Sequence, residues 1–159
     1  MPNFNVVGVF CEDIREEKSG TDTLVGVMPD NISVQAVPGL FPKIAFYTRA
    51  HIPIDSPIRS ISIKVILLDG TTVELGGFDA SAIEKEMEAV RKKGTPHVGF
   101  IFRGILSPMP IPKFGRVNVW AKVDEEEFVC ASLNVEQAAN ASTASAQPSE
   151  QSQPASPQT

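Results

Sequence analysis

The feature that most constrains the fold is the regular alternation of short apolar runs and turn signals along the first 135 residues. In these runs apolar residues often occupy every second position, and Pro, Gly or Asp-Gly separates one run from the next, which is typical of the strands of a β-sandwich. Asp69-Gly70 is the strongest hairpin signal. We predict eight or nine strands, among residues 4–11, 23–28, 32–36, 43–52, 58–68, 71–75, 98–106, 113–123 and 128–135.

One segment, residues 79–93, follows the period of a helix instead. Its apolar residues recur at helical spacing: Ala80, Ile83, Met87 and Val90. Asp79 is a suitable N-cap, and Gly94 follows a basic last turn as a C-terminal stop. The predicted fold class is therefore mostly β, an immunoglobulin-like antiparallel β-sandwich with one inserted α-helix at about 79–93.

The last 24 residues, 136–159, contain only Glu, Gln, Ala, Asn, Ser, Thr and Pro. A segment without large apolar side chains cannot bury enough surface to offset the entropy lost on ordering. We predict a sandwich domain over residues 1–135 and a disordered C-terminal tail over 136–159.

The charge of the chain argues against two classes of partner. The net charge is −5; the tail holds two of the 19 acidic residues and none of the 14 basic ones, which leaves −3 for the domain. A negative domain does not attract nucleic acid, and no run of residues is long and apolar enough to span a membrane. The N-terminus lacks the basic start of a signal peptide, so we expect a cytoplasmic protein whose two cysteines are reduced.

The order of several motifs resembles a known family. An early strand ends in Cys11-Glu12-Asp13, Leu24-Val25-Gly26-Val27 follows a polar loop, a long strand ends in Leu68-Asp69-Gly70, and a closing hairpin ends in Val135. Over about residues 4–135 the chain resembles a family of small bacterial and phage-associated proteins, a domain of unknown function with a presumed β-sandwich fold. The helix at 79–93 has no counterpart in this resemblance. The resemblance implies the fold and a bacterial or phage-associated origin, and it implies no catalytic residue.

No motif in the chain predicts catalysis, a cofactor or a metal. His51, His97, Cys11 and Cys130 do not have the close spacing of metal ligands. Carboxylates next to Cys11 disfavour its thiolate, and alternation predicts a buried thiol there. The acidic runs at 12–17 and 124–127 fall on predicted turns and lack the spacing of a calcium loop.

The most informative pattern is the set of side chains that alternation places on the outer side of three strands. If residues 43–52, 98–106 and 113–123 share one sheet, its outer face is basic and aromatic on an acidic protein. The candidate binding face consists of Tyr47, Arg49, His51, Arg103, Arg116, Trp120 and Lys122.

Three interpretations of this face remain open. It could dock a protein partner, because Tyr, Trp and Arg are common interface anchors. The helix at 79–93 could cover it and bury Trp120, or the face could simply be solvated. For the whole chain we therefore expect a non-enzymatic binding or structural module, in the cytoplasm or in a phage-derived assembly, of unknown oligomeric state. The alternative is a small enzyme whose site assembles only in the tertiary structure.

Overall fold

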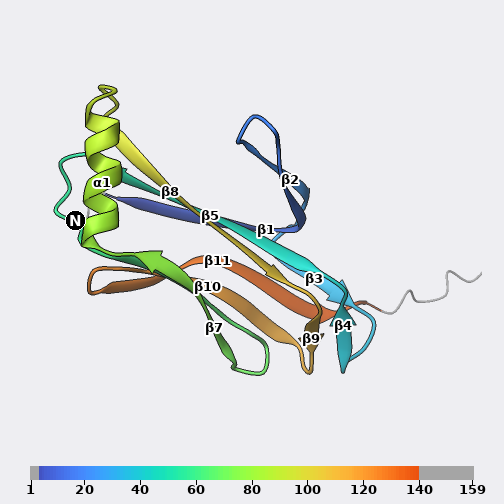
Figure 1. The fold of residues 1–159 in the computed structure, drawn as a ribbon. Coiled ribbons are helices and arrows are strands. Elements are labelled where there is room, and N and C mark those ends of the chain that lie inside the picture. The colour runs from blue at the N-terminus through green and yellow to red at the C-terminus, as the bar shows by residue number, and fades with distance from the viewer. Residues whose placement is uncertain (1–3, 140–159) are drawn as a thin grey trace, which may run out of the picture.

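The computed structural model describes residues 4–139 and shows a β-sandwich of two sheets (Figure 1). Sheet A contains, in order, β2 (Asp22–Val27), β1 (Asn5–Glu16), β5 (Ile44–Pro53) and β8 (His97–Leu106). Sheet B contains β3 (Asn31–Val34), β11 (Glu126–Gln137), β10 (Gly115–Val123), β6 (Ile61–Ile66) and β7 (Thr72–Phe78). Two short strands, β4 (Gly39–Phe41) and β9 (Met109–Ile111), pair separately.

The structure confirms an immunoglobulin-like, mostly β sandwich with one inserted helix, and all nine predicted strands are present. One pairing differs from expectation, because β3 runs parallel to β11 and sheet B is therefore mixed. Strands β4 and β9 were not predicted; they are three residues long and lie next to prolines. The last strand was predicted to end at residue 135, whereas β11 continues to Gln137. The predicted disorder from residue 140 onward lies outside the described residues.

Alternating side chains of the two sheets form one core between them. On the inner side of β5, Ile44, Phe46 and Ile52 are fully buried, and they meet Val117 and Val119 of β10 in the same apolar cluster. Thr48 is the buried polar residue of this layer, and its hydroxyl has no hydrogen-bond partner among the described residues.

Glycines allow the closest approaches within this core. A Cβ on Gly104 of β8 would lie only 1.8 Å from Cζ of the Phe46 ring. A Cβ on Gly8 of β1 would lie 3.0 Å from that of Ala131 in β11, so the two sheets nearly touch at this corner.

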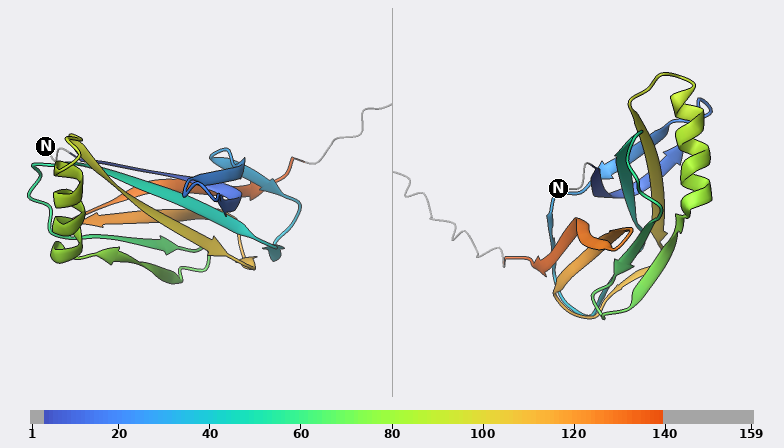
Figure 2. Two further views of the ribbon diagram at one scale, coloured as in Figure 1. Left: turned by 45° about the horizontal axis from the view of Figure 1, so that its top comes forward. Right: turned by 90° about the vertical axis from the view of Figure 1, so that its left-hand side faces the viewer.

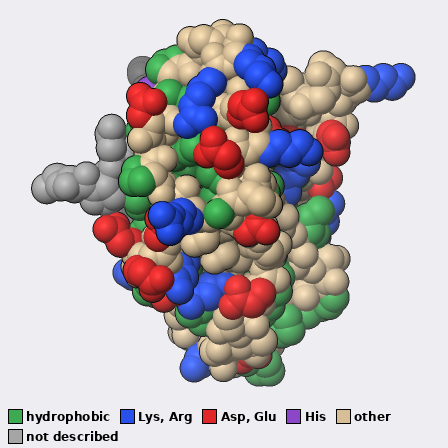
Figure 3. All heavy atoms as spheres, turned by 60° about the vertical axis from the view of Figure 1, so that its left-hand side comes forward, with side chains coloured by type: hydrophobic (Ala, Val, Ile, Leu, Met, Phe, Trp, Pro, Cys, Tyr) green, Lys and Arg blue, Asp and Glu red, His purple; other side chains and the backbone are tan. Residues whose placement is uncertain are grey.

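The helix α1 (Ala80–Arg91) stands at the end of the sandwich where β7 ends and β8 begins (Figures 1 and 2). Asp79 caps it, because its carboxylate accepts a hydrogen bond of 2.9 Å from the Ala82 N–H. Ile83 and Met87 are buried in the main core. On the side that carries α1, basic and acidic side chains are interspersed and form no patch of one sign (Figure 3).

The β1–β2 hairpin bends away from the edge of sheet A and folds across its outer face. Asp22, at the start of β2, accepts a 2.9 Å hydrogen bond from Nε of Arg103 in β8, although β5 lies between β1 and β8 in the sheet. Asp13 of β1 forms an ion pair with Lys43, the residue before β5. Cys11 and Ala45, which face each other on this outer side, are consequently fully buried.

Candidate functional site

The seven residues of the predicted binding face lie on two different sheets. Strands β5 and β8 belong to sheet A, whereas β10 belongs to sheet B. The prediction that the three strands share one sheet is therefore wrong, although alternation assigned the outward side of each strand correctly. Sheet A carries Tyr47, Arg49, His51 and Arg103, and sheet B carries Arg116, Trp120 and Lys122.

The outer face of sheet A combines basic, aromatic and aliphatic side chains in two cross-strand rows. One row is Val7–Arg49–Ile101 and the next is Val9–Tyr47–Arg103. Val7, Val9 and Ile101 are 51%, 38% and 40% exposed, although each lies within a paired strand. Val7 and Ile101 flank Arg49 from the two neighbouring strands, so the exposed aliphatic side chains surround the arginine. We call these two rows the A face.

The two arginines of the A face differ in their charge partners. Arg103 binds Asp22 at 2.9 Å and approaches Glu16 at 4.0 Å, and the hydrogen bond to Asp22 raises the pKa of Arg103 above its ordinary value. Arg49 has no ion pair among the described residues, and Gly99 leaves space beside its guanidinium, since a Cβ there would lie 3.4 Å from Nε. Arg49 is therefore the cation that the A face offers to a partner.

The remaining three residues lie on the outer side of sheet B. Trp120 is half-buried between its cross-strand neighbours Lys64 and Val129. Its indole Nε1 is shielded from solvent and has no hydrogen-bond partner within residues 4–139. The interpretation in which the helix covers Trp120 does not hold, because the buried side of α1 faces the main core. Lys122 is exposed opposite Glu127.

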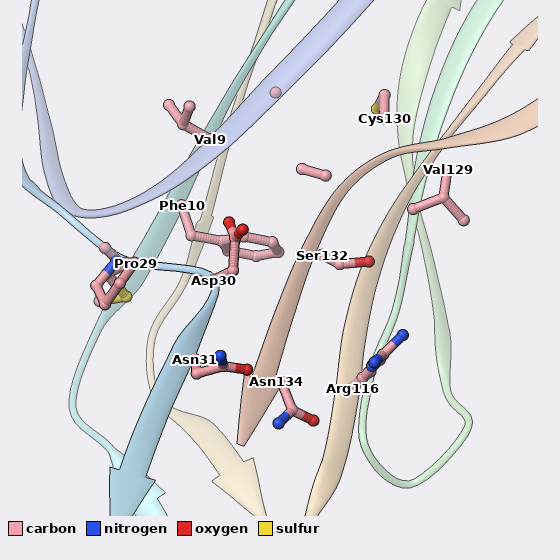
Figure 4. A pocket seen from close by; sticks show the side chains of 13 residues that line it. Val9, Phe10, Pro29, Asp30, Asn31, Arg116, Val129, Cys130, Ser132 and Asn134 are labelled. Carbon is pink, nitrogen blue, oxygen red and sulfur yellow. The ribbon is translucent and has the colours of Figure 1, made fainter. Parts of the chain in front are cut away.

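Arg116 borders a cavity that no sequence pattern indicated. This notch encloses about 480 Å³ between β1, β11 and the segment that joins β2 to β3 (Figure 4). Its apolar wall includes Phe10, Met28 and Val129, and its polar groups are Asp30, Asn31, Arg116, Ser132 and Asn134. Met28-Pro29-Asp30-Asn31 resembles an ordinary turn in the sequence, and only the crossing of this turn between the sheets brings it beside β11.

A second cavity, of about 590 Å³, lies at the other end of β11, where Phe4, Pro57 and Val123 form apolar walls and acidic side chains form the rim. One of these, Asp124, has a structural role, because its carboxylate accepts hydrogen bonds from the N–H groups of Arg59 and Ser60. Among residues 4–139, no three His, Cys, Asp or Glu side chains are grouped as they would be around a metal ion.

Both cysteines are free thiols in environments that disfavour the thiolate. Burial is the main cause that raises the pKa of Cys11. Burial also raises the pKa of Cys130, which lines the notch, to about 11, and its thiol donates to the Val119 carbonyl at 3.4 Å. Neither cysteine is activated as a nucleophile at neutral pH.

Within the part of the chain that the structure describes, no helix has the length and apolar character of a membrane span.

The comparisons with known proteins identify the family of the chain. No curated protein and no solved structure matches the chain. A family model described as a family of unknown function, DUF6941, matches residues 6–136, which is more than half of the 159 residues. The chain therefore belongs to the DUF6941 family of unknown function.

Proposed function

We propose that this protein is a non-enzymatic binding module that docks a partner protein on its A face. The observation that carries the proposal is the combination of Val7, Val9 and Ile101, all open to solvent, around Arg49, which forms no ion pair within the described part of the chain. Aliphatic side chains supply apolar area for a partner, while an arginine among them supplies a directional, charge-assisted hydrogen bond.

The chemistry of the A face specifies its partner. A matching surface presents aliphatic or aromatic side chains around a carboxylate that pairs with Arg49. Tyr47 adds a flat aromatic surface next to Arg49 in β5. Arg103 is held by Asp22 and contributes packing area rather than a free charge. The binding energy therefore depends on one desolvated ion pair surrounded by apolar contacts, which is the usual arrangement of an interface hot spot.

We also propose that the module acts in the cytoplasm of a bacterium or in a phage-derived assembly. The resemblance described above supports the origin, and two free cysteines are compatible with a reducing compartment.

Substitution by acidic residues on the two outer faces tests the docking proposal. Full-length protein is immobilised and exposed to an extract of the organism that encodes it, with Arg49→Glu and Ile101→Asp as test variants. Lys122→Glu, an exposed substitution of the same charge type on sheet B, is the matched control. We expect a protein that is retained by the wild type and by Lys122→Glu, and that neither A-face variant retains. Equal retention by all four proteins would refute the proposal.

A further inference from the structure

The segment that joins β2 to β3 leaves two strand edges uncovered. Along β1, pairing with β2 begins only at Cys11, opposite Val27. Along β11, pairing with β3 begins only at Asn134, opposite Asn31. Between these points Met28, Pro29 and Asp30 cross from sheet A to sheet B. From Glu126 to Leu133, the edge of β11 that points away from β10 has no strand partner among the described residues.

Unpaired edges are usually protected, because a row of free N–H and C=O groups can pair with any extended chain. Here β3 protects the end of β11 but stops where the notch begins. At the inner end of the notch, Gly8 of β1 and Ala131 of β11 nearly touch, so the open space runs along the edge of β11, with β1 as its opposite wall. The notch is therefore a gap in sheet B, in line with β3.

The side chains around this gap include polar groups suited to an extended backbone. Arg116, Asn134 and Asn31 form one cross-strand row over β10, β11 and β3. Asp30 lines the notch from the segment that joins β2 to β3, and Arg116 lies beyond β11 (Figure 4). Asp30 and Arg116 form no ion pair with each other or with any other described residue. Two unpaired charges of opposite sign thus border the same gap.

We propose that the notch binds an extended segment of a partner protein, which pairs with the free edge of β11 and continues sheet B beyond β3. Main-chain hydrogen bonds provide affinity in such strand addition, and alternate side chains provide specificity. An apolar side chain of the segment fits against Phe10 and Val129, an acidic one faces Arg116, and a basic one faces Asp30. This opposite charge pattern fixes the direction of the bound segment. The site shares only Val9 with the A face, contains neither Arg49 nor Ile101, and does not depend on the function of that face.

Selection from a peptide library tests this proposal. A phage-displayed library of random ten-residue peptides is selected on the full-length protein, and enriched peptides are synthesised and titrated by fluorescence anisotropy. The test variant is Asn31→Trp, which fills the notch from the exposed first residue of β3. The matched control is Ser33→Trp, which is also exposed, lies two residues further along the same strand, and does not line the notch.

We expect enriched peptides with an apolar residue between an acidic and a basic one. Asn31→Trp should weaken their binding about tenfold or more, and Ser33→Trp should leave it within about twofold. Arg116→Glu should weaken binding, and replacing the acidic residue of the peptide by lysine should restore binding to this variant. Bound peptide should also slow amide hydrogen exchange between residues 126 and 133, a readout that side-chain contact alone would not change.

Several results would overturn the proposal. These are a selection that enriches no peptide, equal binding by Asn31→Trp and the wild type, and loss of binding in Arg49→Glu, which would place the peptide on the A face. Unchanged exchange in β11 would refute strand addition. Competition by a synthetic peptide of residues 140–159 as strong as that of the enriched peptides would identify the chain's own C-terminal segment as the occupant. Displacement by free amino acids would indicate a small zwitterion instead.

Discussion

The contact between Gly104 and Phe46 permits a sharp test of how sheet A packs on the core. Phe46 is fully buried, and a Cβ on Gly104 would lie 1.8 Å from Cζ and within 2.5 Å of both Cε atoms of its ring. Because the ring has no free space, Gly104→Ala must displace it or the backbone of β8. We expect a loss of about 2–3 kcal/mol, toward the upper end of the overpacking range. The melting temperature should fall by roughly 6–12 °C.

A second variant distinguishes packing from general damage to β8. Phe46→Leu removes three carbon atoms and should cost about 2 kcal/mol on its own. In the double variant the alanine methyl enters the space that the ring has left, so its cost should be at least ~1 kcal/mol below the sum of the two single costs. Urea unfolding followed by circular dichroism measures all three values, provided that the m-value stays constant. Strictly additive costs would show that residue 104 does not meet the Phe46 ring, and the packing described above would be incorrect.

Three further predictions concern single features of the fold. The hydrogen bond from the Ala82 N–H is the largest of the causes that lower the pKa of Asp79. The stabilisation that the Asp79 carboxylate provides is therefore present above the ordinary Asp pKa of 3.8 and is lost as the pH falls through the lowered pKa of the folded state. Asp79→Asn should therefore match the wild type in melting temperature at pH 7 and lose less stability between pH 5 and pH 2; parallel curves would contradict this. Trp120→Phe removes an unpartnered N–H and should change the free energy of unfolding by less than about 1 kcal/mol, whereas a larger loss in urea titration would reveal a missed hydrogen bond. A chain ending at Ala139 should keep the melting temperature of the full chain, but one ending at Val135 should melt lower, because it loses the pairs of residues 136 and 137 with β3; equal melting would show that these pairs contribute nothing.

The sequence predicts which way a side chain points more reliably than which sheet its strand joins. Alternation placed Phe46 and Val117 inward and Arg49 and Trp120 outward, because the two-residue period depends only on the local backbone. Sheet membership depends on which strands pair across long stretches of chain, and alternation contains no such information. Arg49 and Trp120 were therefore joined in one predicted face, although they lie on opposite sides of the sandwich.

The notch shows a second limit of the same kind. Asp30, Asn134 and Arg116 come from three separate parts of the chain, and each is an ordinary polar residue in its own segment. They become neighbours because β3 pairs with β11 in parallel and β11 pairs with β10. Alternation put Val7 and Val9 on the same side of their strand as Cys11, and the buried thiol expected there implied that this side faces the core. The side in fact faces outward, and Cys11 is buried there only because the β1–β2 hairpin folds across it.

The parallel pairing of β3 with β11 affects how the chain folds while the ribosome synthesises it. Asn134 follows its partner Asn31 by 103 residues (134 − 31). At a synthesis rate of roughly 5–20 residues per second, β3 waits about 5–20 s for the strand that completes its hydrogen bonds. Throughout that interval Ile32 and Val34, which belong to the border of the finished core, have no sheet to join. Until its last strand emerges, the nascent chain thus exposes the unpaired strand β3 near its N-terminus. Mispairing between neighbouring nascent chains is therefore most probable when many ribosomes translate the protein close together.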